Sequence, residues 1–307
     1  MEQAWFRRGV DGLRLAVTLL TAIPLPGPRP KDGNGRPPAA PPAATSRFSR
    51  DYGSGSAGQG PPAGHPEAPG ARPPATATAP PAPTRQSAGD AMALAPAVGL
   101  ALGAAAALVL YVFQRYWHAG PLLGSTLAVI TLAVLTRGLH LDGLADTADG
   151  LGSRRPAAGA LEIMRRSDIG PFGVAVLILT LLLQVTALTQ ADALGRGVTS
   201  VAAAALCGRL AMAWACGRGI PPARPDGLGA LVAGSLHPAV PAVLSALAVA
   251  GSSAYGLIFP VAMAAGLAAG LLLCWLAVRR LGGITGDVLG AICEVSTAAC
   301  LLVLALS

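Results

Sequence analysis

The sequence predicts an all-α fold: a polytopic bundle of about seven transmembrane helices, preceded by an N-terminal interfacial or re-entrant helix. Three observations predict it. Of the 307 residues, 53% are hydrophobic and only 12% are charged, whereas soluble domains carry about 25% charged residues. Aromatic residues make up 4%, so the apolar content is mainly Ala, Leu, Val and Gly, and the small ones allow close helix packing in a bilayer. The apolar residues also fall into long uninterrupted runs.

The first element is the segment 1–26, which ends in an apolar run at 15–26 preceded by Arg7, Arg8 and Arg14. Spanning a bilayer needs about 20 apolar residues, and this run is too short. No small-residue cleavage site follows it, so a secretory signal peptide is not favoured. We expect an uncleaved interfacial or re-entrant helix that belongs to the membrane domain.

The second element is an insert at 27–89, dense in Pro, Ala, Gly, Ser and Thr with almost no large aliphatic residues. Such a composition cannot bury enough apolar surface to offset the entropy cost of ordering the chain. The sequence therefore predicts a disordered insert, with no helix or strand.

The third element, 90–307, is predicted to be the transmembrane catalytic domain. Its apolar runs are long enough to cross a bilayer, the second being the shortest. The predicted spans are 91–113, 121–136, 172–190, 198–217, 238–256, 258–278 and 288–306.

The basic residues are distributed unevenly about these spans. With the N-terminal helix as non-spanning, 19 of the 22 Lys and Arg residues fall on one side, only Arg115 and Arg196 fall on the other, and Arg209 lies within a span. By the positive-inside rule the first side is cytoplasmic. The net charge of +7 is explained in the same way. Nucleic-acid binding is not favoured, because no basic run is interleaved with aromatic residues.

The five cysteines all lie in apolar segments and form no Cys-x-x-Cys pair, so we interpret them as small buried hydrophobic residues.

The loop 137–171 carries most of the candidate chemistry. Asp142, Asp146 and Asp149 are spaced at i, i+4 and i+7, which places three carboxylates on one face of a helix. Their mutual repulsion would be relieved by a hard divalent cation, and Mg²⁺ binds one or two carboxylates together with substrate phosphates. The pattern indicates Mg²⁺-assisted phosphoryl chemistry at a membrane–water boundary.

Two alternatives remain for this stretch: a solvated acidic loop, and part of an ion pathway. The acids adjoin an apolar span, where charge is costly unless it is used. His140 precedes Asp142 by two residues and could act as a general base, a metal ligand or a phosphate donor.

Cations accompany the acids. Guanidinium groups bind phosphate in bidentate fashion, but the same residues could simply anchor the cytoplasmic side. Arg209, inside a span, should face the bundle interior and find an acidic partner or a substrate phosphate. The candidate substrate-binding residues of the loop are Arg137, Arg165, Arg166 and Asp168.

Near the C-terminus, the segment Gly282-Gly-Ile-Thr-Gly-Asp287 could form a tight turn that approaches phosphate, a weak indication by itself. Glu294 follows Asp287 by seven residues, so the two could share a helix face with the cytoplasmic site. Both are candidate substrate-binding residues.

These segments resemble the cobalamin synthase family, the adenosylcobinamide-GDP ribazoletransferases. The resemblance covers everything outside the insert 27–89, and its second segment is the most specific. The four segments are Thr21-Ala-Ile-Pro-Leu-Pro26, Arg137-Gly-Leu-His-Leu-Asp-Gly-Leu-Ala-Asp-Thr-Ala-Asp-Gly150, Glu162–Gly173 and Gly282-Gly-Ile-Thr-Gly-Asp-Val-Leu-Gly290.

The resemblance implies a membrane enzyme that joins adenosylcobinamide-GDP to α-ribazole or its 5′-phosphate and releases GMP, in the last steps of vitamin B12 assembly. It implies a Mg²⁺ requirement and a multi-pass protein of the bacterial inner membrane with a cytoplasmic active site. A homo-oligomer is compatible with the sequence. One departure is visible: Arg166 holds the family's usual Asp position, and Asp168 holds its usual Arg position.

Two rival functions fit less well. A CDP-alcohol phosphotransferase would carry Arg after Ala145, where this sequence has Asp146, and its later pair of Asp residues is missing. A transporter or channel would carry ionisable residues through several spans, whereas here only Arg209 and Glu294 do so.

Overall fold

The computed structural model describes residues 16, 18, 84–117 and 120–306. Most of the predicted N-terminal helix 1–26 and of the insert 27–89 therefore lies outside the described residues. The described part is built from helices, with two isolated β-bridges and no strand. Helix α2, Arg85–Trp117, begins five residues before the predicted start of the membrane domain at residue 90.

Five helices are long and apolar enough to cross a membrane, which confirms the predicted polytopic all-α class. Helices α2 and α11 have large buried faces, whereas α6 exposes most of its surface, as lipid-facing helices do. The five are α2, α6 (Pro171–Ala193), α7 (Gly197–Ala215), α10 (Ile258–Leu281) and α11 (Gly286–Ala305).

The predicted total of seven spans is not confirmed. Helix α9, Ala239–Ser253, has only 15 residues, about 22 Å at 1.5 Å per residue, which is less than the ~30 Å hydrocarbon core. Helices α3 (Pro121–Leu135) and α4 (Leu139–Gly152) pass the length test only as a pair, and they meet at a bend of 87°. Counting that pair as one span raises the number to six.

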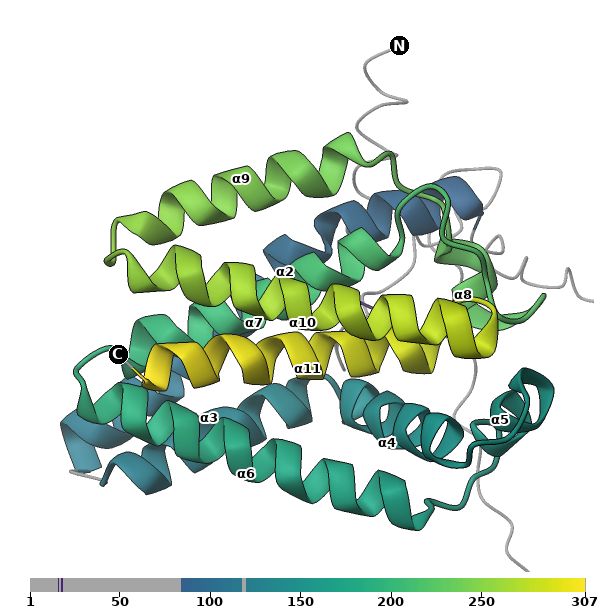
Figure 1. Cartoon of the computed structure of the whole chain (residues 1–307). Coiled ribbons are helices and arrows are strands. Elements are labelled where there is room, and N and C mark those ends of the chain that lie inside the picture. The colour runs from purple at the N-terminus through teal and green to yellow at the C-terminus, as the bar shows by residue number, and fades with distance from the viewer. Residues whose placement is uncertain (1–15, 17, 19–83, 118–119, 307) are drawn as a thin grey trace, which may run out of the picture. The chain divides into compact units, whose positions relative to one another are not determined.

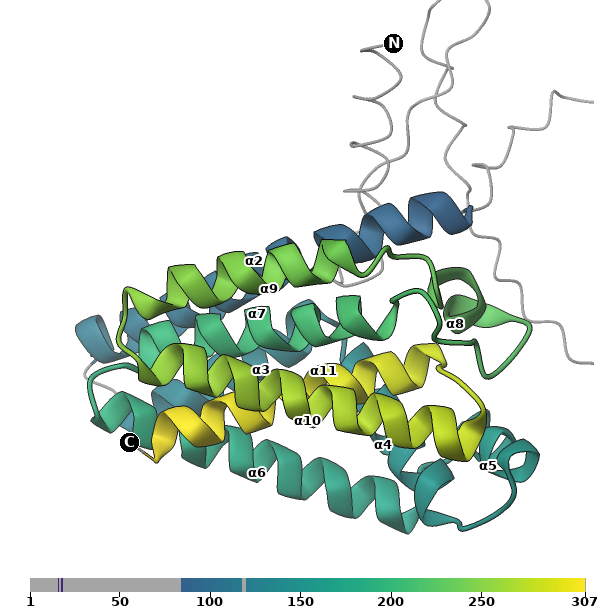
Figure 2. The ribbon, with the colours of Figure 1, turned by 45° about the horizontal axis from the view of Figure 1, so that its top comes forward.

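Helix α7 lies in the middle of the bundle and packs against α2, α10 and α11 (Figures 1 and 2). Its contact faces are rich in Ala and Gly, so backbones approach closely: a Cβ on Gly99 of α2 would lie 2.7 Å from the Ala205 carbonyl. Small-residue packing of this kind is what holds helices together in a bilayer, where burying apolar surface gains little.

The two ends of the bundle differ. The acidic helix α4 and the short helices α5 (Ala157–Ile163) and α8 (Gly227–Val232) lie at one end, and the α6–α7 and α9–α10 turns lie at the other (Figure 1). The polar candidate residues between 142 and 171 therefore gather at a single end of the membrane domain.

Candidate functional site

The bend between α3 and α4 is made by two consecutive residues in the left-handed region, Arg137 (φ 55°) and Gly138 (φ 69°). Glycine adopts this conformation without cost. Arginine does so at a cost of roughly 1–2 kcal/mol. The turn redirects the chain, so the three-aspartate face forms a helix of its own, as predicted, that does not continue α3.

Helix α4 packs backbone to backbone against the start of α11. A Cβ on Gly143 would lie 2.6 Å from the Asp287 carbonyl oxygen, and one on Gly290 would lie 3.0 Å from the His140 Cα. The two contacts run antiparallel, so His140 lies one turn below the start of α11, inside the bundle. Residues of α4 after Gly143 extend past the start of α11, one of the five helices long and apolar enough to cross a membrane.

Three acids meet at this junction. Asp142 is exposed, Asp146 is half-buried, and Asp287 lies in the first turn of α11, where its carboxylate accepts a hydrogen bond from the Thr285 hydroxyl (3.2 Å). Burial, followed by the negative charges of Asp142, Asp287 and Asp149, raises the pKa of Asp146 to about 7. We call Asp142, Asp146 and Asp287 the acid cluster. Its charges repel one another in a poorly solvated place, which is the setting that a hard cation relieves.

Asp149, the third predicted metal ligand, is used differently. Its carboxylate is buried, and its two oxygens accept backbone N–H bonds from Gly170 (2.7 Å) and Gly173 (2.9 Å). These donors belong to the first turn of α6, which has no cap of its own side chains. A Cβ on either glycine would lie 2.4 Å from the carboxylate, so the Gly170-x-x-Gly173 spacing makes room for it.

Sequence reasoning missed one residue at the acid cluster, Arg224. Its Nη1 lies 3.7 Å from Asp287 Oδ2, and its charge opposes the rise in the pKa of Asp146. In the sequence it stood only as one of many basic residues on the cytoplasmic side. The feature that could have identified it is the segment Pro221-Pro-Ala-Arg224, in which two prolines make the backbone before a single arginine rigid.

The predicted substrate-binding arginines of the loop before α6 lie at the surface of this end. Nη2 of Arg165 donates to both carboxylate oxygens of Asp226 (2.8 and 3.0 Å), and both side chains are more than half exposed. Arg166 and Asp168, whose positions are exchanged relative to the family pattern, are also exposed, as is Arg137. The structure does not bring Arg166 or Asp168 into the acid cluster.

Below the acid cluster lies a buried polar group inside the bundle. Arg209 is 2% exposed, and its Nη2 lies 3.2 Å from Nδ1 of His140. Glu294 accepts a hydrogen bond from Gln184 Nε2 at 2.7 Å and lines a small cavity together with Arg209. Arg209 thus faces the bundle interior beside an acid, as predicted. Glu294 lies two turns deeper than Asp287, in this group rather than in the acid cluster.

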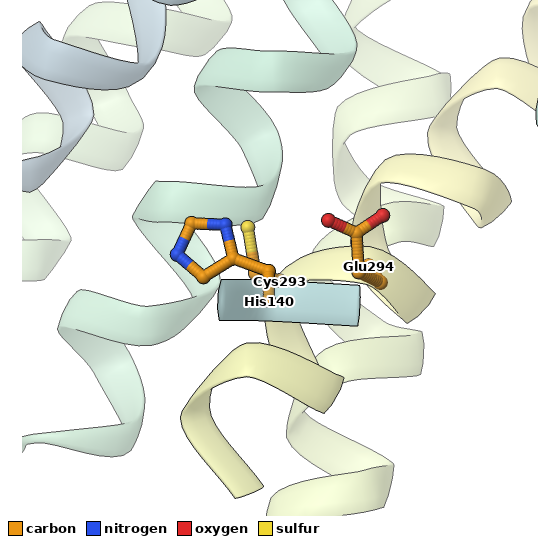
Figure 3. A group of neighbouring side chains, drawn as sticks. All are labelled: His140, Cys293 and Glu294. Atoms are coloured by element: carbon orange, nitrogen blue, oxygen red, sulfur yellow. The ribbon is translucent and has the colours of Figure 1, made fainter. Parts of the chain in front are cut away.

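Figure 3 shows His140, Cys293 and Glu294, whose potential metal-ligating atoms all lie within 4.8 Å of one another. The cation next to them is already supplied by Arg209, whose guanidinium donates to Nδ1 of His140. A metal ion would have to compete with that fixed positive charge for the same lone pair. We therefore interpret the group as a network in which Arg209 supplies the positive charge.

A separate cavity of about 780 Å³ lies among α2, α7, α9 and α10. No acidic or basic side chain lines it. It therefore offers no carboxylate to hold a metal ion and no cation to bind phosphate.

Comparison with known proteins identifies a family for the chain. The profile of a family described as cobalamin-5-phosphate synthase matches residues 74–305. A protein of Frankia casuarinae named adenosylcobinamide-GDP ribazoletransferase is 44% identical over 243 residues, covering 73% of this chain and 87% of its own. Proteins with the same name from Bradyrhizobium diazoefficiens (42% over 219 residues, 68% and 80%) and Citrobacter koseri (38% over 224 residues, 68% and 85%) are also similar. No solved structure matches the chain.

Proposed function

The chain belongs to the cobalamin-5-phosphate synthase family, and from this premise we propose the reaction that its acid cluster carries out. The coarse function follows from membership: the protein is a multi-pass membrane transferase of cobalamin biosynthesis. The finer proposal is that it transfers the adenosylcobinamide phosphate group from adenosylcobinamide-GDP to α-ribazole or α-ribazole 5′-phosphate. The bond to GMP breaks, and the product is adenosylcobalamin or its 5′-phosphate.

The acid cluster is the single observation that supports a Mg²⁺-dependent reaction. Its carboxylates supply the hard oxygen ligands that Mg²⁺ prefers. Asp142, Asp146 and Asp287 would hold the ion, and Asp149 positions α6 beside them. Bound Mg²⁺ would neutralise charge on the diphosphate of the GDP-activated substrate.

The protein's own groups do the remaining work in this proposal. Arg165, released from Asp226, binds the leaving GMP, since a guanidinium matches phosphate oxygens in bidentate fashion. The attacking ribazole hydroxyl gives its proton to a carboxylate of α4. His140 is a poor acceptor, because it is buried and Nδ1 already accepts from Arg209.

We propose that the acid cluster faces the cytoplasm of a bacterium, across the inner membrane. The arginines of this end support that orientation by the positive-inside rule. The five native cysteines are buried, so single exposed cysteines can report the side. Glu162→Cys in sealed spheroplasts should resist a membrane-impermeant maleimide, and Arg115→Cys should react. The reverse labelling would contradict the proposed orientation.

The reaction is tested with membranes given adenosylcobinamide-GDP, α-ribazole and Mg²⁺, with GMP release and corrinoid product measured together. We expect both to appear, to vanish with EDTA, and to vanish in Asp142→Asn. Asp90→Asn is the matched control, because Asp90 is an exposed acid on α2. GMP release that persists in EDTA or in Asp142→Asn would reject the metal assignment.

A further inference from the structure

We infer that Arg224 binds a phosphate group of the nucleotide-activated substrate beside the acid cluster, an inference that rests on the proposed function. The guanidinium is placed there by a loop that contacts α5, the segment before α11 and the first turn of α11. Those contacts leave several of its N–H donors unused.

The loop that carries Arg224 is tied to the start of α11. The Ala223 N–H donates to the Ile284 carbonyl (2.9 Å), and the Ile284 N–H donates to the Pro221 carbonyl (3.0 Å). A Cβ on Gly283 would lie 2.3 Å from that Pro221 carbonyl, so only glycine permits this approach. The Gly-Gly pair of the segment that begins at Gly282 therefore accommodates the Arg224 loop and is not a phosphate-binding turn by itself.

The guanidinium is anchored at one nitrogen only. Arg224 Nη2 donates to the Leu161 carbonyl at 2.7 Å, near the C-terminus of α5. Nε is buried and has no hydrogen-bond partner among the described residues. Nη1 lies 3.7 Å from Asp287 Oδ2, an ion pair that is longer than a hydrogen bond. A buried donor without a partner is costly, so a ligand that supplies acceptors would be favoured at this position.

Charge decides which kind of ligand fits. A divalent cation at Asp142, Asp146 and Asp287 would lie close to the positive Arg224, and the two would repel. A phosphate that accepts hydrogen bonds from Arg224 and also contacts the cation removes that repulsion. Arg224 should therefore make cation binding and phosphate binding depend on each other, because a coupling free energy acts equally on both ligands.

The structural alternative is that Arg224 only neutralises the acids. Both roles predict that Mg²⁺ alone binds more tightly after Arg224 is removed. Only the binding role predicts that nucleotide affinity falls when Mg²⁺ is saturating. The two roles are therefore separated by nucleotide affinity rather than by activity.

The experiment measures binding of GDP to the purified full-length protein in nanodiscs at saturating Mg²⁺, and binding of Mg²⁺ alone, by calorimetry. For Arg224→Gln we expect GDP affinity to fall at least about tenfold, the loss of a charged hydrogen-bonded contact, and Mg²⁺ affinity to rise. In Arg224→Lys the GDP affinity should fall by roughly threefold, because lysine keeps the positive charge but lacks the planar, two-pronged set of guanidinium donors. Arg218→Gln, an exposed arginine of the same loop, is the matched control and should bind GDP like the unaltered protein.

Unchanged GDP affinity in a folded Arg224→Gln protein would overturn the inference while leaving the proposed function intact. If thermal unfolding shows that Arg224→Gln is not folded, the Arg224→Lys variant is used instead. A GDP affinity of Arg224→Lys equal to that of the unaltered protein would then overturn the inference. If the unaltered folded protein binds no GDP at saturating Mg²⁺, the inference is overturned, whereas the proposed function is rejected separately, by the absence of GMP release.

Discussion

The carboxylate of Asp149 accepts a hydrogen bond from the backbone N–H of Gly173 at 2.9 Å, so the last acid of α4 caps the start of α6. A second bond to Gly170 uses its other oxygen. The acids of α4 thus lie in two different environments, although their regular spacing on one helix face does not distinguish them. Asp142 is exposed at the acid cluster, and Asp149 is buried at the start of α6.

Asp149→Asn should destabilise the protein more than Asp142→Asn does. An asparagine side chain offers one acceptor oxygen, so one of the two backbone N–H groups loses its partner, at a cost of roughly 1–3 kcal/mol. Thermal unfolding in detergent would measure the difference. Asp142→Asn should unfold like the unaltered protein and yet lose activity, and the opposite ranking of the two variants would contradict this division.

Gly143→Ala should displace the start of α11 and lower both stability and activity. The added methyl would lie 2.6 Å from the Asp287 carbonyl oxygen, and overpacking of this kind costs typically ~1–3 kcal/mol. Gly251→Ala is the matched control on α9, because its methyl would meet nothing within 4 Å, and it should be neutral or stabilising. Equal behaviour of the two variants would show that α4 and α11 do not need their close approach.

Arg209 and Glu294 should be energetically coupled. Replacing either one alone, by Arg209→Met or Glu294→Gln, leaves a buried charge without compensation, a loss of about 3–5 kcal/mol in soluble proteins. The double variant removes both charges, so its destabilisation should be clearly less than the sum of the two single losses. Unfolding of all four proteins under one condition measures the coupling, and simple additivity would exclude a paired network.

The stability of the metal-free protein should fall as pH rises. The pKa of Asp146 is raised from 3.8 to about 7, so between these values the folded state holds a proton that the unfolded state has released. Such a group stabilises the fold at the lower pH and loses that contribution as pH rises through 7. Unfolding temperatures in EDTA between pH 5 and 8 would show this slope. Asp146→Asn should flatten it, and added Mg²⁺ should raise stability most at the higher pH, where the carboxylate is charged.

Arg137→Gly should leave the fold as stable as before, or make it more stable by up to ~1 kcal/mol, because glycine adopts φ 55° without strain. If Arg137 binds substrate, as predicted, the same variant should lose activity. A stable variant with full activity would show that the arginine serves only as a membrane-side charge. Substrate titration of the two proteins distinguishes these outcomes.

Much of this arrangement could be predicted from particular residues. The spacing of Asp142 and Asp146 predicted one helical face, and the cost of a lone cation in a bilayer predicted that Arg209 would face inward. Asp287 was recognised because it follows a glycine-rich turn. These features depend on neighbours in sequence or on a single physical penalty, so the chain reveals them directly.

The remainder depends on contacts between distant segments. Nothing in the acidic stretch shows that Asp149 would turn toward Gly170, or that Arg224 would be carried to Asp287 by backbone pairing with Ile284. The 87° bend between α3 and α4 was also missed, because its first left-handed residue is an arginine, a residue type that rarely adopts this conformation. The short α9 was counted as a span since its flanking residues are apolar although they are not helical.

The packing of α4 against α6 and α11 has a consequence for how the protein is made. Both partners of α4 are synthesised after it, and α11 is the last described helix of the chain. An isolated α4 with three aspartates is a poor candidate for insertion by the translocon. Helix α4 can therefore pack into the bundle only after α11 has been inserted, when the close approaches at Gly143 and Gly290 can form. Nascent chains that stop before α11 would lack Asp287 and the partner of Gly143, so the acid cluster can form only after α11 has been synthesised.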